Sequence, residues 1–578
     1  MISPLAPVRP RADVLDLITR GWRAYALIAA LTICGALPGF FSIPPLDRDE
    51  SRFAQATAQM LETGDFVRIA VQDDPRNKKP VGIHWLQAAA VAATSSVEAR
   101  EIWAYRLPSM AGAVLAALAA LWAGTALVGR RAAFIGAALL GVCLLLSTEG
   151  MIAKTDAVLC GVTTLTLAAL AHLRVRRPDQ SGFGLAFLAW AALGVGILVK
   201  GPITPLVAAL TLGALALWER RAAWMRPLLQ VWGPLAAAAI VAPWVIAIQI
   251  STGGAFLSEA VGHDLGTKIS GGGEHPFTPP GLHLALLPIL SFPMAIALVP
   301  AARLAWAAAR APRASDEYST LRFLVAWAVP TFLMFELTPT KLAHYTLPAY
   351  PAIALLAGAG LVAMMDKTWT RTRWASVALA SFAAAALVAV CAAMTTLFPG
   401  AETLARSRMA ETAVVGGAAA AAWLVALAMT RRPEAWLALA VTAGLAFSIT
   451  ARERFAPQMD KVLVSRAASR ALADAALHPR LSAGVGPFWI VGYREPSLVF
   501  STITAAKLID GEAAGRQAPA DAAMLVEQRE RSNLDRELAA RGLRFAPIGP
   551  TVTGQNYSNG ETVALQPGRV ERAVQAAD

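Results

Sequence analysis

Long apolar stretches separated by short polar loops dominate the pattern of this chain. A helix that crosses a membrane needs about 20 mostly apolar residues, and about thirteen segments approach that length. Several segments are rich in alanine, which lets helices pack closely in lipid. The pattern therefore predicts a multi-pass α-helical membrane protein. The predicted spans are residues 25–44, 107–128, 132–149, 157–173, 183–199, 201–218, 228–250, 281–302, 322–337, 345–365, 374–398, 412–430 and 434–450.

Basic residues follow every second span and set the predicted orientation. Arginines precede the first span, and arginine or lysine recurs in the loops near residues 130, 176, 220, 310, 371 and 431. The positive-inside rule assigns such loops to the cytoplasm. The alternate loops, predicted to lie outside, are 45–106, 150–156, 251–280, 338–344 and 399–411.

The last part of the chain has a different composition. Mixed charge, turn residues and short apolar runs such as 488–491 are typical of a small α/β domain. With thirteen spans before it, this domain is predicted outside. The sequence thus predicts a transmembrane domain over residues 1–450, with a functional first outer loop at 45–106 and a mobile loop at 251–280, and an outer α/β domain over residues 451–578.

Composition agrees with a membrane protein and argues against nucleic-acid binding. The chain is 56% hydrophobic and 16% charged, whereas soluble domains carry about 25% charged residues. The net charge of +12 is scattered over short loops, as membrane topology requires, so no nucleic-acid partner is predicted. The four cysteines lie in apolar stretches without zinc spacing or a disulfide framework. The first apolar run lacks a small-residue cleavage site, which predicts a retained helix.

The first outer loop opens with a cluster of charge. Asp49, Glu50 and Arg52 directly follow the first span. Carboxylates beside a guanidinium can hold a base and a phosphate together, but Asp49 and Glu50 can equally cap the helix expected after them. That helix is amphipathic, with Phe53, Ala56, Met60 and Leu61 on one face.

A second motif in the same loop is basic. Lys78 and Lys79 precede Pro80, and His84 and Trp85 follow. Lysine and proline at the start of a helix present an ammonium and free N–H groups, a combination that suits an anion. The alternatives are a solvated basic loop near anionic headgroups and, for Trp85, an interfacial anchor.

Two further motifs adjoin the outer ends of predicted spans. Lys154, Thr155 and Asp156 begin the fourth span. A carboxylate at the edge of a membrane span needs a cationic partner. This motif is therefore either catalytic or, as the alternative, a structural pair in which Lys154 neutralises Asp156. Lys200 begins a Lys-Gly-Pro turn that is predicted to connect two helices.

The remaining outer loops carry histidine, lysine and tyrosine. His263 and Lys268 lie among glycines, which suit a mobile loop around a phosphate or a divalent ion, although no pair has zinc spacing. Lys341 and Tyr345 are four residues apart and flank His344. On a helical turn they would face one way and grip a lipid phosphate; a snorkelling lysine with an interfacial tyrosine is the alternative.

All these polar motifs share one predicted side of the membrane. That asymmetry favours an enzyme that acts on lipid-borne substrates at one face. A transporter or lipid flippase is the first alternative, but transporters usually place charged sites near the bilayer midplane and often contain inverted repeats. A structural or assembly protein is the second alternative.

The motifs also resemble those of a known family. Residues 49–54 (Asp-Glu-Ser-Arg-Phe-Ala), residues 61–65 (Leu-Glu-Thr-Gly-Asp) and Lys79-Pro80 are similar to the first periplasmic loop of the aminoarabinose transferases. The similarity continues through residues 154–156, 200–202, 243–244, the His263 loop and 338–351. It implies the GT-C fold, shared with the protein O-mannosyltransferase clan, with a C-terminal periplasmic domain.

The resemblance implies an inverting glycosyltransferase at the periplasmic face of the bacterial inner membrane. Its donor would be a sugar on undecaprenyl phosphate, a polyprenyl phosphate. Its acceptor would be lipid A, a lipopolysaccharide sugar or another envelope lipid, with protein O-glycosylation as the alternative. No cofactor is assigned, and a divalent metal ion remains open.

The resemblance also assigns site residues. Asp49 matches the reaction-centre carboxylate, Asp156 a second acidic residue, Lys79 and Tyr345 the donor-phosphate contacts, and His263 a nearby loop histidine. Residue chemistry adds Lys268 and Lys341 to the phosphate contacts, and places Glu50, Arg52, Lys78, His84 and His344 in the substrate-binding set.

Two positions depart from the family. Lys78 stands where the family commonly has glutamate, which puts the acceptor in doubt. The loop reads Gly262-His263-Asp264, with Lys268 in the basic role, where the family commonly has Glu-His and then arginine. The sugar is therefore not assigned from the sequence.

Overall fold

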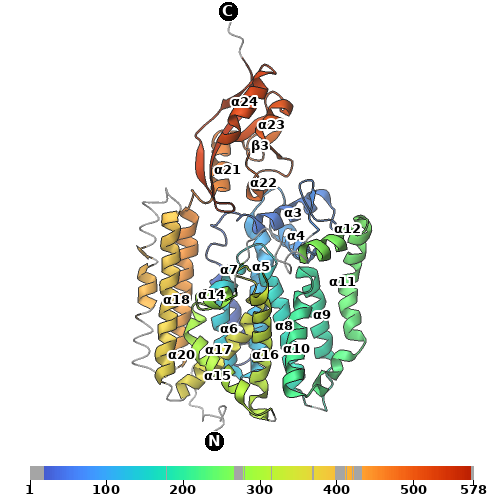
Figure 1. Ribbon diagram of the computed structural model, residues 1–578, viewed down its shortest axis with the longest axis vertical. Helices are drawn as coiled ribbons and strands as arrows, with labels where there is room; N and C mark the ends of the chain where they lie inside the picture. The colour runs from blue at the N-terminus through green and yellow to red at the C-terminus, as the bar shows by residue number, and fades with distance from the viewer. Residues whose placement is uncertain are drawn as a thin grey trace, which may run out of the picture.

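The computed structural model describes residues 18–573 except 78, 178, 266–277, 279, 314, 367–369, 398–409, 412, 420 and 422–432. A helical bundle forms most of the molecule, and a smaller domain lies at one end of it (Figure 1). The bundle contains α2 (Trp22–Ala36), α5 (Ile102–Leu127), α6 (Arg130–Gly141), α7 (Leu144–Glu149), α8 (Asp156–Val175), α9 (Phe183–Lys200), α10 (Ile203–Glu219), α11 (Trp232–Ser251), α14 (Leu282–Leu290), α15 (Leu298–Arg310), α16 (Ser319–Leu337), α17 (Tyr350–Asp366), α18 (Thr370–Leu397) and α20 (Pro433–Ser448).

Among the described residues, eight helices are long and apolar enough to cross a membrane, or nine if one bent pair is a single span. The multi-pass helical architecture is confirmed, but the predicted count of about thirteen is not. Helices α2 and α10 have only 15 and 17 residues, the predicted span 132–149 is divided between α6 and α7, and most of 412–430 lies outside the described residues. The predicted span 281–302 bends by 107° between α14 and the segment from Met294 to Arg310.

Helices α5 and α8 lie at the centre of the bundle. Small residues on both helices let their backbones pack closely against each other. A Cβ atom on Gly112 would lie 2.5 Å from the backbone of Val158, and one on Gly161 would lie 2.6 Å from the carbonyl oxygen of Gly112. Such small-residue contacts drive helix association in lipid. They fix the start of α8, and therefore Asp156, against α5.

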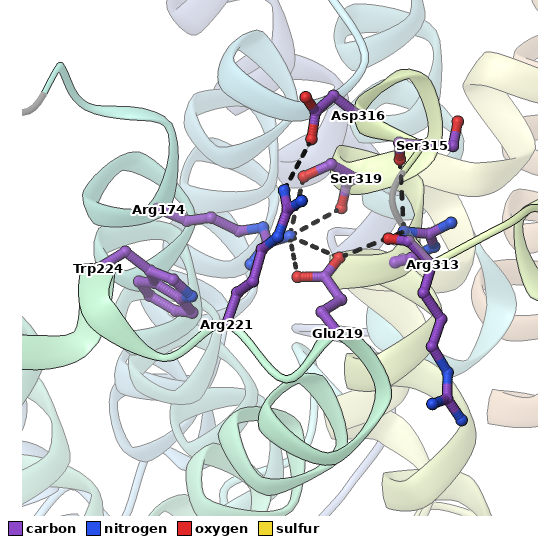
Figure 2. Close-up of a pocket in the computed structure, with 9 residues that line it drawn as sticks. Arg174, Glu219, Arg221, Trp224, Arg313, Ser315, Asp316 and Ser319 are labelled. Carbon is purple, nitrogen blue, oxygen red and sulfur yellow. Dashed lines mark hydrogen bonds and ion pairs between the residues drawn. The ribbon is translucent and has the colours of Figure 1, made fainter.

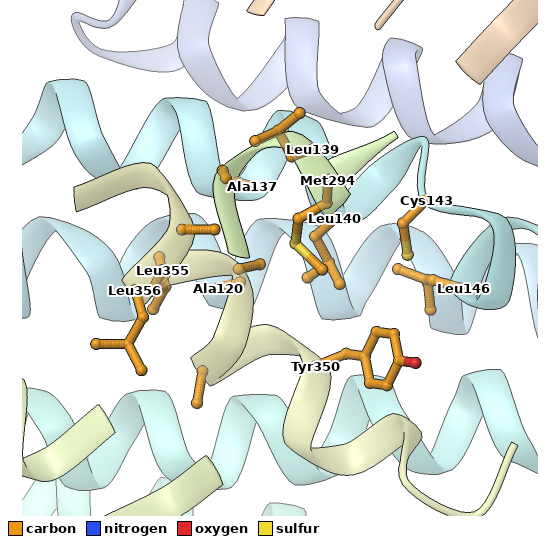
Figure 3. Packing of buried hydrophobic residues seen from close by; sticks show 14 of the residues in the cluster. Ala120, Ala137, Leu139, Leu140, Cys143, Leu146, Met294, Tyr350, Leu355 and Leu356 are labelled. Carbon is orange, nitrogen blue, oxygen red and sulfur yellow. The ribbon is translucent and has the colours of Figure 1, made fainter. Parts of the chain in front are cut away.

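The apolar core surrounds these two helices. Figure 3 shows Leu139, Leu140, Leu146, Met294 and Leu355 packed together from α6, α7, η3 (Met294–Ala297) and α17. All five side chains are buried. The helices at the centre are therefore held by interdigitated side chains, and the polar ends of α7, α8 and α17 occupy fixed positions.

The first long loop folds as a separate cap on the end of the bundle that faces the small domain (Figure 1). It contains α3 (Asp49–Thr63), a short hairpin of β1 (Ala70–Val71) and β2 (Asp74–Pro75), and α4 (Gly82–Thr94). The predicted amphipathic helix is confirmed as α3, which buries Phe53, Ala56 and Met60. The second loop adds α12 (Ala255–Leu257) and η2 (Ser258–Leu265) nearby.

The C-terminal part is an α/β domain, as the sequence predicts; its predicted boundary at residue 450 remains a prediction. Its sheet has the order β4-β3-β5-β8-β6, with β7 also paired to β8. Strands β3, β4 and β5 are parallel to one another, and the other pairs are antiparallel. The elements are α21 (Val464–Asp474), β3 (Phe488–Val491), α22 (Pro496–Ser501), β4 (Lys507–Ile509), α23 (Gly511–Gln517), β5 (Ala523–Glu527), α24 (Arg531–Ala539), β6 (Leu543–Pro547), β7 (Val552–Asn556) and β8 (Glu561–Arg572).

Strand β3 is buried on both faces, which explains its continuous apolar run Phe-Trp-Ile-Val. Alternate side chains of a strand point to opposite faces. Phe488 and Ile490 join a core with α21, while Trp489 and Val491 join a second core with α24. The sheet is thus covered on both sides by helices and forms its own hydrophobic core, independent of the bundle.

Candidate functional site

Five ionisable side chains meet at the end of the bundle that faces the C-terminal domain. We call this group the Asp156 cluster; its members are Glu149, Lys154, Asp156, Lys200 and His344. They come from the end of α7, the turn before α8, the start of α8, the end of α9 and the loop before α17. Three separate stretches of sequence, residues 149–156, Lys200 and His344, therefore converge on one polar site.

Asp156 is at the centre of this cluster. Lys200 Nζ donates a 2.6 Å hydrogen bond to Asp156 Oδ1. Lys154 Nζ lies 3.9 Å from Oδ2, and His344 Nε2 lies 3.7 Å from Oδ1. A carboxylate at the N-terminus of α8 is also favoured by the helix dipole. Among the residues that the structure describes, Lys200 is therefore the nearest cation to Asp156, although the sequence predicted only a helix connector there.

Glu149 is a member of the cluster that the sequence analysis missed. Its side chain is buried, with Oε2 2.9 Å from Lys154 Nζ and Oε1 3.9 Å from His344 Nδ1. The contact with Lys154 is a short, buried ion pair. A glutamate at the end of a predicted span was the available signal, because buried carboxylates in membranes need cationic partners.

The two nitrogen-bearing groups beside Glu149 respond oppositely to this environment. Burial opposes the charged form of Lys154, but the carboxylates of Glu149 and Asp156 outweigh burial and raise the pKa of this lysine. Burial lowers the pKa of His344 to about 3, although Asp156 acts in the other direction. His344 is therefore a neutral imidazole at neutral pH, and its Nδ1 lies 3.4 Å from Lys154 Nζ.

Asp49 supplies an open carboxylate beside the cluster. It is the first residue of α3 and is exposed. The neighbouring Glu50 accepts a hydrogen bond from the N–H of Ala153, which precedes Lys154, so the start of α3 lies on the same side of the bundle as the cluster. The Asp49 charge favours the protonated form of Lys154. No hydrogen bond or ion pair holds its carboxylate among the residues that the structure describes, and the same is true of the half-buried Arg52 guanidinium. These two groups thus remain available to a ligand.

Glu50, the neighbour of Asp49, is committed to the fold. Its carboxylate accepts 2.7 and 2.9 Å hydrogen bonds from Arg106, and both side chains are almost fully buried. It also accepts hydrogen bonds from the backbone N–H groups of Leu46 and Ala153. Glu50 and Arg106 therefore join α3 to the turn that carries Lys154, and this geometry favours a positioning role over direct substrate contact.

Tyr345 adjoins the cluster through Lys200, whose Nζ lies 5.6 Å from the centre of the tyrosine ring. Lys79 approaches from the first loop. It precedes α4, and Gly82 lets this helix start close to the end of α9: a Cβ on Gly82 would lie 2.6 Å from the carbonyl oxygen of Leu198. The start of α4, which the half-buried Lys79 precedes, therefore packs against the last turn of α9, which carries Lys200.

Two predicted contact residues lie in other surroundings. His84 is fully buried, and its Nδ1 lies 2.8 Å from Thr57 Oγ1. Burial lowers the pKa of His84 to about 3. Lys341 Nζ donates to the carbonyl oxygens of Thr278 and Thr338. The expected helical turn that would align Lys341 with Tyr345 is wrong, because residues 338–346 form bends and turns instead of a helix. The predicted substrate and phosphate contacts of these two residues stay predictions.

Three predicted residues lie partly or wholly outside the described residues. Lys78 and Lys268 are among them, and His263 is placed only by its backbone within η2. Among the described residues, no group of three or more His, Cys, Asp or Glu side chains could hold a metal ion. The divalent metal therefore stays an open prediction, and no catalytic step is assigned to it.

The C-terminal domain is hydrogen-bonded directly to the cap that carries Asp49. Thr504 contacts Gln55, Glu62 and Arg100 at 2.7–2.8 Å. Asp47 Oδ1 accepts a hydrogen bond from the N–H of Ser497 at the start of α22. Helix α3 is therefore fixed from two sides, by the Glu50–Arg106 pair below and by the C-terminal domain above.

Comparison with known sequences gives a consistent result. Residues 49–254 match the family described as dolichyl-phosphate-mannose-protein mannosyltransferase. An undecaprenyl phosphate-α-4-amino-4-deoxy-L-arabinose arabinosyl transferase from Pectobacterium carotovorum is 27% identical over 357 residues, which cover 59% of this chain and 60% of that protein. An enzyme of the same name from Pseudomonas aeruginosa is 28% identical over 341 residues, covering 56% and 58%. The alignment thus spans about 60% of the length of these relatives.

Solved structures extend the similarity to nearly the whole chain. ArnT from Cupriavidus metallidurans, in a crystal structure bound to undecaprenyl phosphate, superposes with a TM-score of 0.72 at 20% identity, covering 95% of this chain and 98% of that one. An oligosaccharyltransferase from Archaeoglobus fulgidus gives a TM-score of 0.51 at 12% identity, covering 95% and 74%. At these identities the similarity shows the fold. This protein therefore has the GT-C fold, and its sequence is similar to those of the aminoarabinose transferases.

Proposed function

We propose that this protein is an inverting glycosyltransferase that moves a sugar from a polyprenyl phosphate to a lipid acceptor. The observation that carries the proposal is the open carboxylate of Asp49 beside the buried Asp156 cluster. The matched relatives are named for a sugar on undecaprenyl phosphate, which makes that donor the first to test. Lipid A, the acceptor that the family resemblance implies, is the corresponding first acceptor.

The donor phosphate would be held from the α9 side of the site. Its leaving oxygen gains negative charge as the bond to the sugar breaks. Lys200 and Tyr345 supply an ammonium group and a phenol near one another, and Lys79 would add a second ammonium from the loop before α4. Preorganised groups of this kind stabilise developing charge strongly in a poorly hydrated site. Arg52, half-buried and close to Asp49 on α3, is a further cation for the phosphate or the acceptor.

The acceptor would be activated by Asp49. In a single displacement, an acceptor oxygen bonds to the anomeric carbon while the bond from that carbon to the phosphate oxygen breaks. The polyprenyl phosphate leaves with the bonding electrons, and Asp49 takes the proton if the acceptor is a hydroxyl. If the acceptor is an anionic phosphate, no proton moves, and Asp49 instead orients it against the sugar.

The Asp156 cluster would set the electrostatics of this step. Asp156 holds Lys200 and lies near Lys154, so both ammonium groups are fixed before the donor arrives. His344 is neutral and does not add a third positive charge. Preorganisation of this kind requires no rearrangement at the moment of transfer.

We further propose that this end of the bundle faces the periplasm and that the membrane is the bacterial inner membrane. The C-terminal domain and the first-loop cap lie at this end, while arginine-rich loops lie at the other (Figure 1). The positive-inside rule places the arginine-rich end in the cytoplasm. The donor's hydrocarbon tail would then remain in the bilayer while its phosphate reaches the site.

The test is mass spectrometry of membrane lipids from cells with and without the protein. The expected result is a mass difference of one sugar on a lipid, lost in Asp49→Asn, which keeps the size of the side chain but removes its charge. Loss of general-base or orienting action should lower transfer by about 100-fold or more. The protein should remain folded, because Asp49 is exposed and holds no other part of the described structure.

Asp73→Asn is the matched control, since Asp73 is an exposed carboxylate in the same loop. It should transfer sugar at the wild-type rate. Unchanged lipid masses on removal of the wild-type protein would refute the proposed lipid acceptor. Full transfer by Asp49→Asn would exclude this carboxylate from the reaction centre.

A further inference from the structure

A second polar site lies at the opposite end of the bundle, far from the C-terminal domain. A cavity of about 160 Å³ opens between the ends of α8 and α10, the segment η1 (Ala223–Leu229) and the loop before α16. Figure 2 shows its lining side chains. They are Arg174, Glu219, Arg221, Trp224, Arg313, Ser315, Asp316, Ser319 and Arg322. We call this cavity the arginine pocket.

Two buried arginines form its rigid wall. Arg174 Nη2 donates to both carboxylate oxygens of Glu219, at 2.8 and 2.6 Å, and to the hydroxyl of Ser319 at 2.9 Å. Arg322 donates to the carbonyl oxygens of Pro312 and Arg313 at 2.6 and 2.9 Å. The wall therefore does not depend on a ligand to hold its shape.

Some donors in this wall remain unused. Arg174 has only 7% of its side chain exposed, yet its Nε has no hydrogen-bond partner among the described residues. The same holds for Trp224 Nε1, and the Arg174 guanidinium lies over the Trp224 ring at 5.5 Å. Buried donors are paired in the great majority of cases. This wall therefore has donor capacity left over for an added acceptor.

The charge of the pocket indicates that this acceptor is an anion. Its lining residues include Arg174, Arg221 and Arg322 together with the carboxylates of Glu219 and Asp316, a formal balance of one positive charge. A fourth lining arginine, Arg313, extends its side chain away from the others (Figure 2). Helix α16 begins at Ser319 on the cavity wall, so the positive end of its dipole adds to this balance. Arginine's fork of donors is suited to phosphate oxygens.

We infer that the arginine pocket binds a phosphate group, supplied by the headgroup of an anionic lipid or by free phosphate. The volume accommodates one such group with a few waters, at about 30 Å³ for each water. A lipid fits the surroundings: Leu217 and Leu229, close in sequence to the pocket residues Glu219 and Trp224, are 80% and 84% exposed and would contact acyl chains. This site is separate from the proposed reaction centre, because it lies at the other end of α8.

The test measures thermal unfolding of the full-length protein in a non-ionic detergent. Dioleoylphosphatidylglycerol is titrated in one arm and inorganic phosphate in the other. A ligand that binds only the folded state raises the unfolding midpoint as its concentration rises. A shift with the lipid alone identifies the headgroup as the source, and an equal shift with phosphate identifies the free ion; either result supports the pocket when the variants below respond.

Two exposed lining residues of the arginine pocket can be substituted with opposite expected effects on ligand affinity. Arg221 and Asp316 are paired at 3.1 Å, with side chains 61% and 87% exposed. Arg221→Ala removes a cation and should weaken binding by about fivefold. Asp316→Asn removes an anion and should tighten it, and neither change disturbs the buried wall.

Arg226→Ala is the control, because Arg226 is an exposed arginine on the same segment that does not line the pocket. It should leave the affinity unchanged. The inference is overturned if neither ligand shifts the midpoint. It is also overturned if Arg226→Ala weakens binding as much as Arg221→Ala, because the effect would then be that of general surface charge.

Discussion

Helix α8 joins two polar sites that differ in kind. Its first residue, Asp156, is bound to Lys200; its penultimate residue, Arg174, is bound to Glu219. Each end carries the charge that the helix dipole favours, negative at the N-terminus and positive at the C-terminus. Both ion pairs are largely buried. The two sites therefore share burial and a favourable helix dipole. They differ in the chemistry of the groups that surround each ion pair.

The Asp156 end contains lysine, histidine and carboxylates, whose protons can move, and it adjoins the open carboxylate of Asp49. The Arg174 end contains guanidiniums, which stay charged and are fixed by Glu219 and by backbone carbonyl oxygens. The first arrangement suits a reaction in which charge develops and protons transfer. The second suits steady binding of an anion. We therefore expect breaking the Asp156–Lys200 pair to affect mainly catalysis, and breaking the Arg174–Glu219 pair to affect mainly stability.

The largest effect is expected from Asp156→Asn. This change removes the acceptor of Lys200 and one of two carboxylates near Lys154, so the cations that would face the donor phosphate lose their positions. Transfer should fall by about 100-fold or more, with some loss of stability. The initial rate of sugar transfer by purified, folded protein measures the effect.

The matched control for Asp156→Asn lies beyond the other end of α8. Asp179 is an exposed carboxylate in the loop that follows this helix. Asp179→Asn makes the same chemical change without touching a buried partner, so the rate should stay within about twofold of wild type. Equal transfer rates in Asp156→Asn and Asp179→Asn would contradict the proposal that the N-terminal end of α8 contributes to catalysis.

Arg174→Gln tests the other end through stability. The change leaves Glu219 buried with Arg322 as its remaining cation, 3.8 Å away. Loss of one partner of a buried ion pair costs about 3–5 kcal/mol, so the unfolding midpoint should fall clearly. Arg177→Gln, at an exposed arginine three residues on, should change stability by less than about 0.5 kcal/mol. Equal midpoints in the two variants would show that the Arg174–Glu219 pair contributes no more than a surface salt bridge.

Local sequence patterns were sufficient to predict the helical membrane domain, α3 and the α/β character of the C-terminal part. Each depends on periodicity or composition over neighbouring residues. The number of spans was not predictable in the same way. Hydropathy assigns one span to residues 281–302, but the chain bends by 107° between α14 and Met294, where Pro293 ends the regular hydrogen bonding.

The site was predictable only where one motif held the residues together. Asp49, Asp156 and Tyr345 stand in recognisable motifs, but the Lys200–Asp156 bond joins residues 44 positions apart. Glu149 belongs to an apolar run, where it looks like the end of a span. Glu50 stands in a recognisable motif but has a structural role. Its neighbour Asp49 is exposed, whereas Glu50 turns inward to Arg106. Which side of a helix's first turn is buried depends on tertiary contacts that spacing does not encode.

Asp47 offers the smallest effect, at the junction that lies above the Asp156 end. It lies where the C-terminal domain meets the cap: its Oδ1 accepts from the N–H of Ser497, and its carbonyl oxygen accepts from the hydroxyl of Tyr557. Burial raises the pKa of Asp47 from 3.8 to about 6, with Glu495 acting in the same direction. The folded protein therefore holds this carboxyl's proton more tightly than the unfolded chain does.

The sign of the pH dependence follows from this shift. The contribution of Asp47 to stability is fully present below pH 3.8 and is lost as the pH rises through about 6. Asp47→Asn imitates the protonated form and can still accept from Ser497, so it should stabilise the protein at pH 7 by about 1–2 kcal/mol and have little effect near pH 4. Unfolding midpoints measured from pH 4 to 8 should converge at the acidic end, with Asp73→Asn following wild type throughout. A constant difference between Asp47→Asn and wild type at every pH would assign the effect to packing and remove Asp47 as a titrating group at the junction.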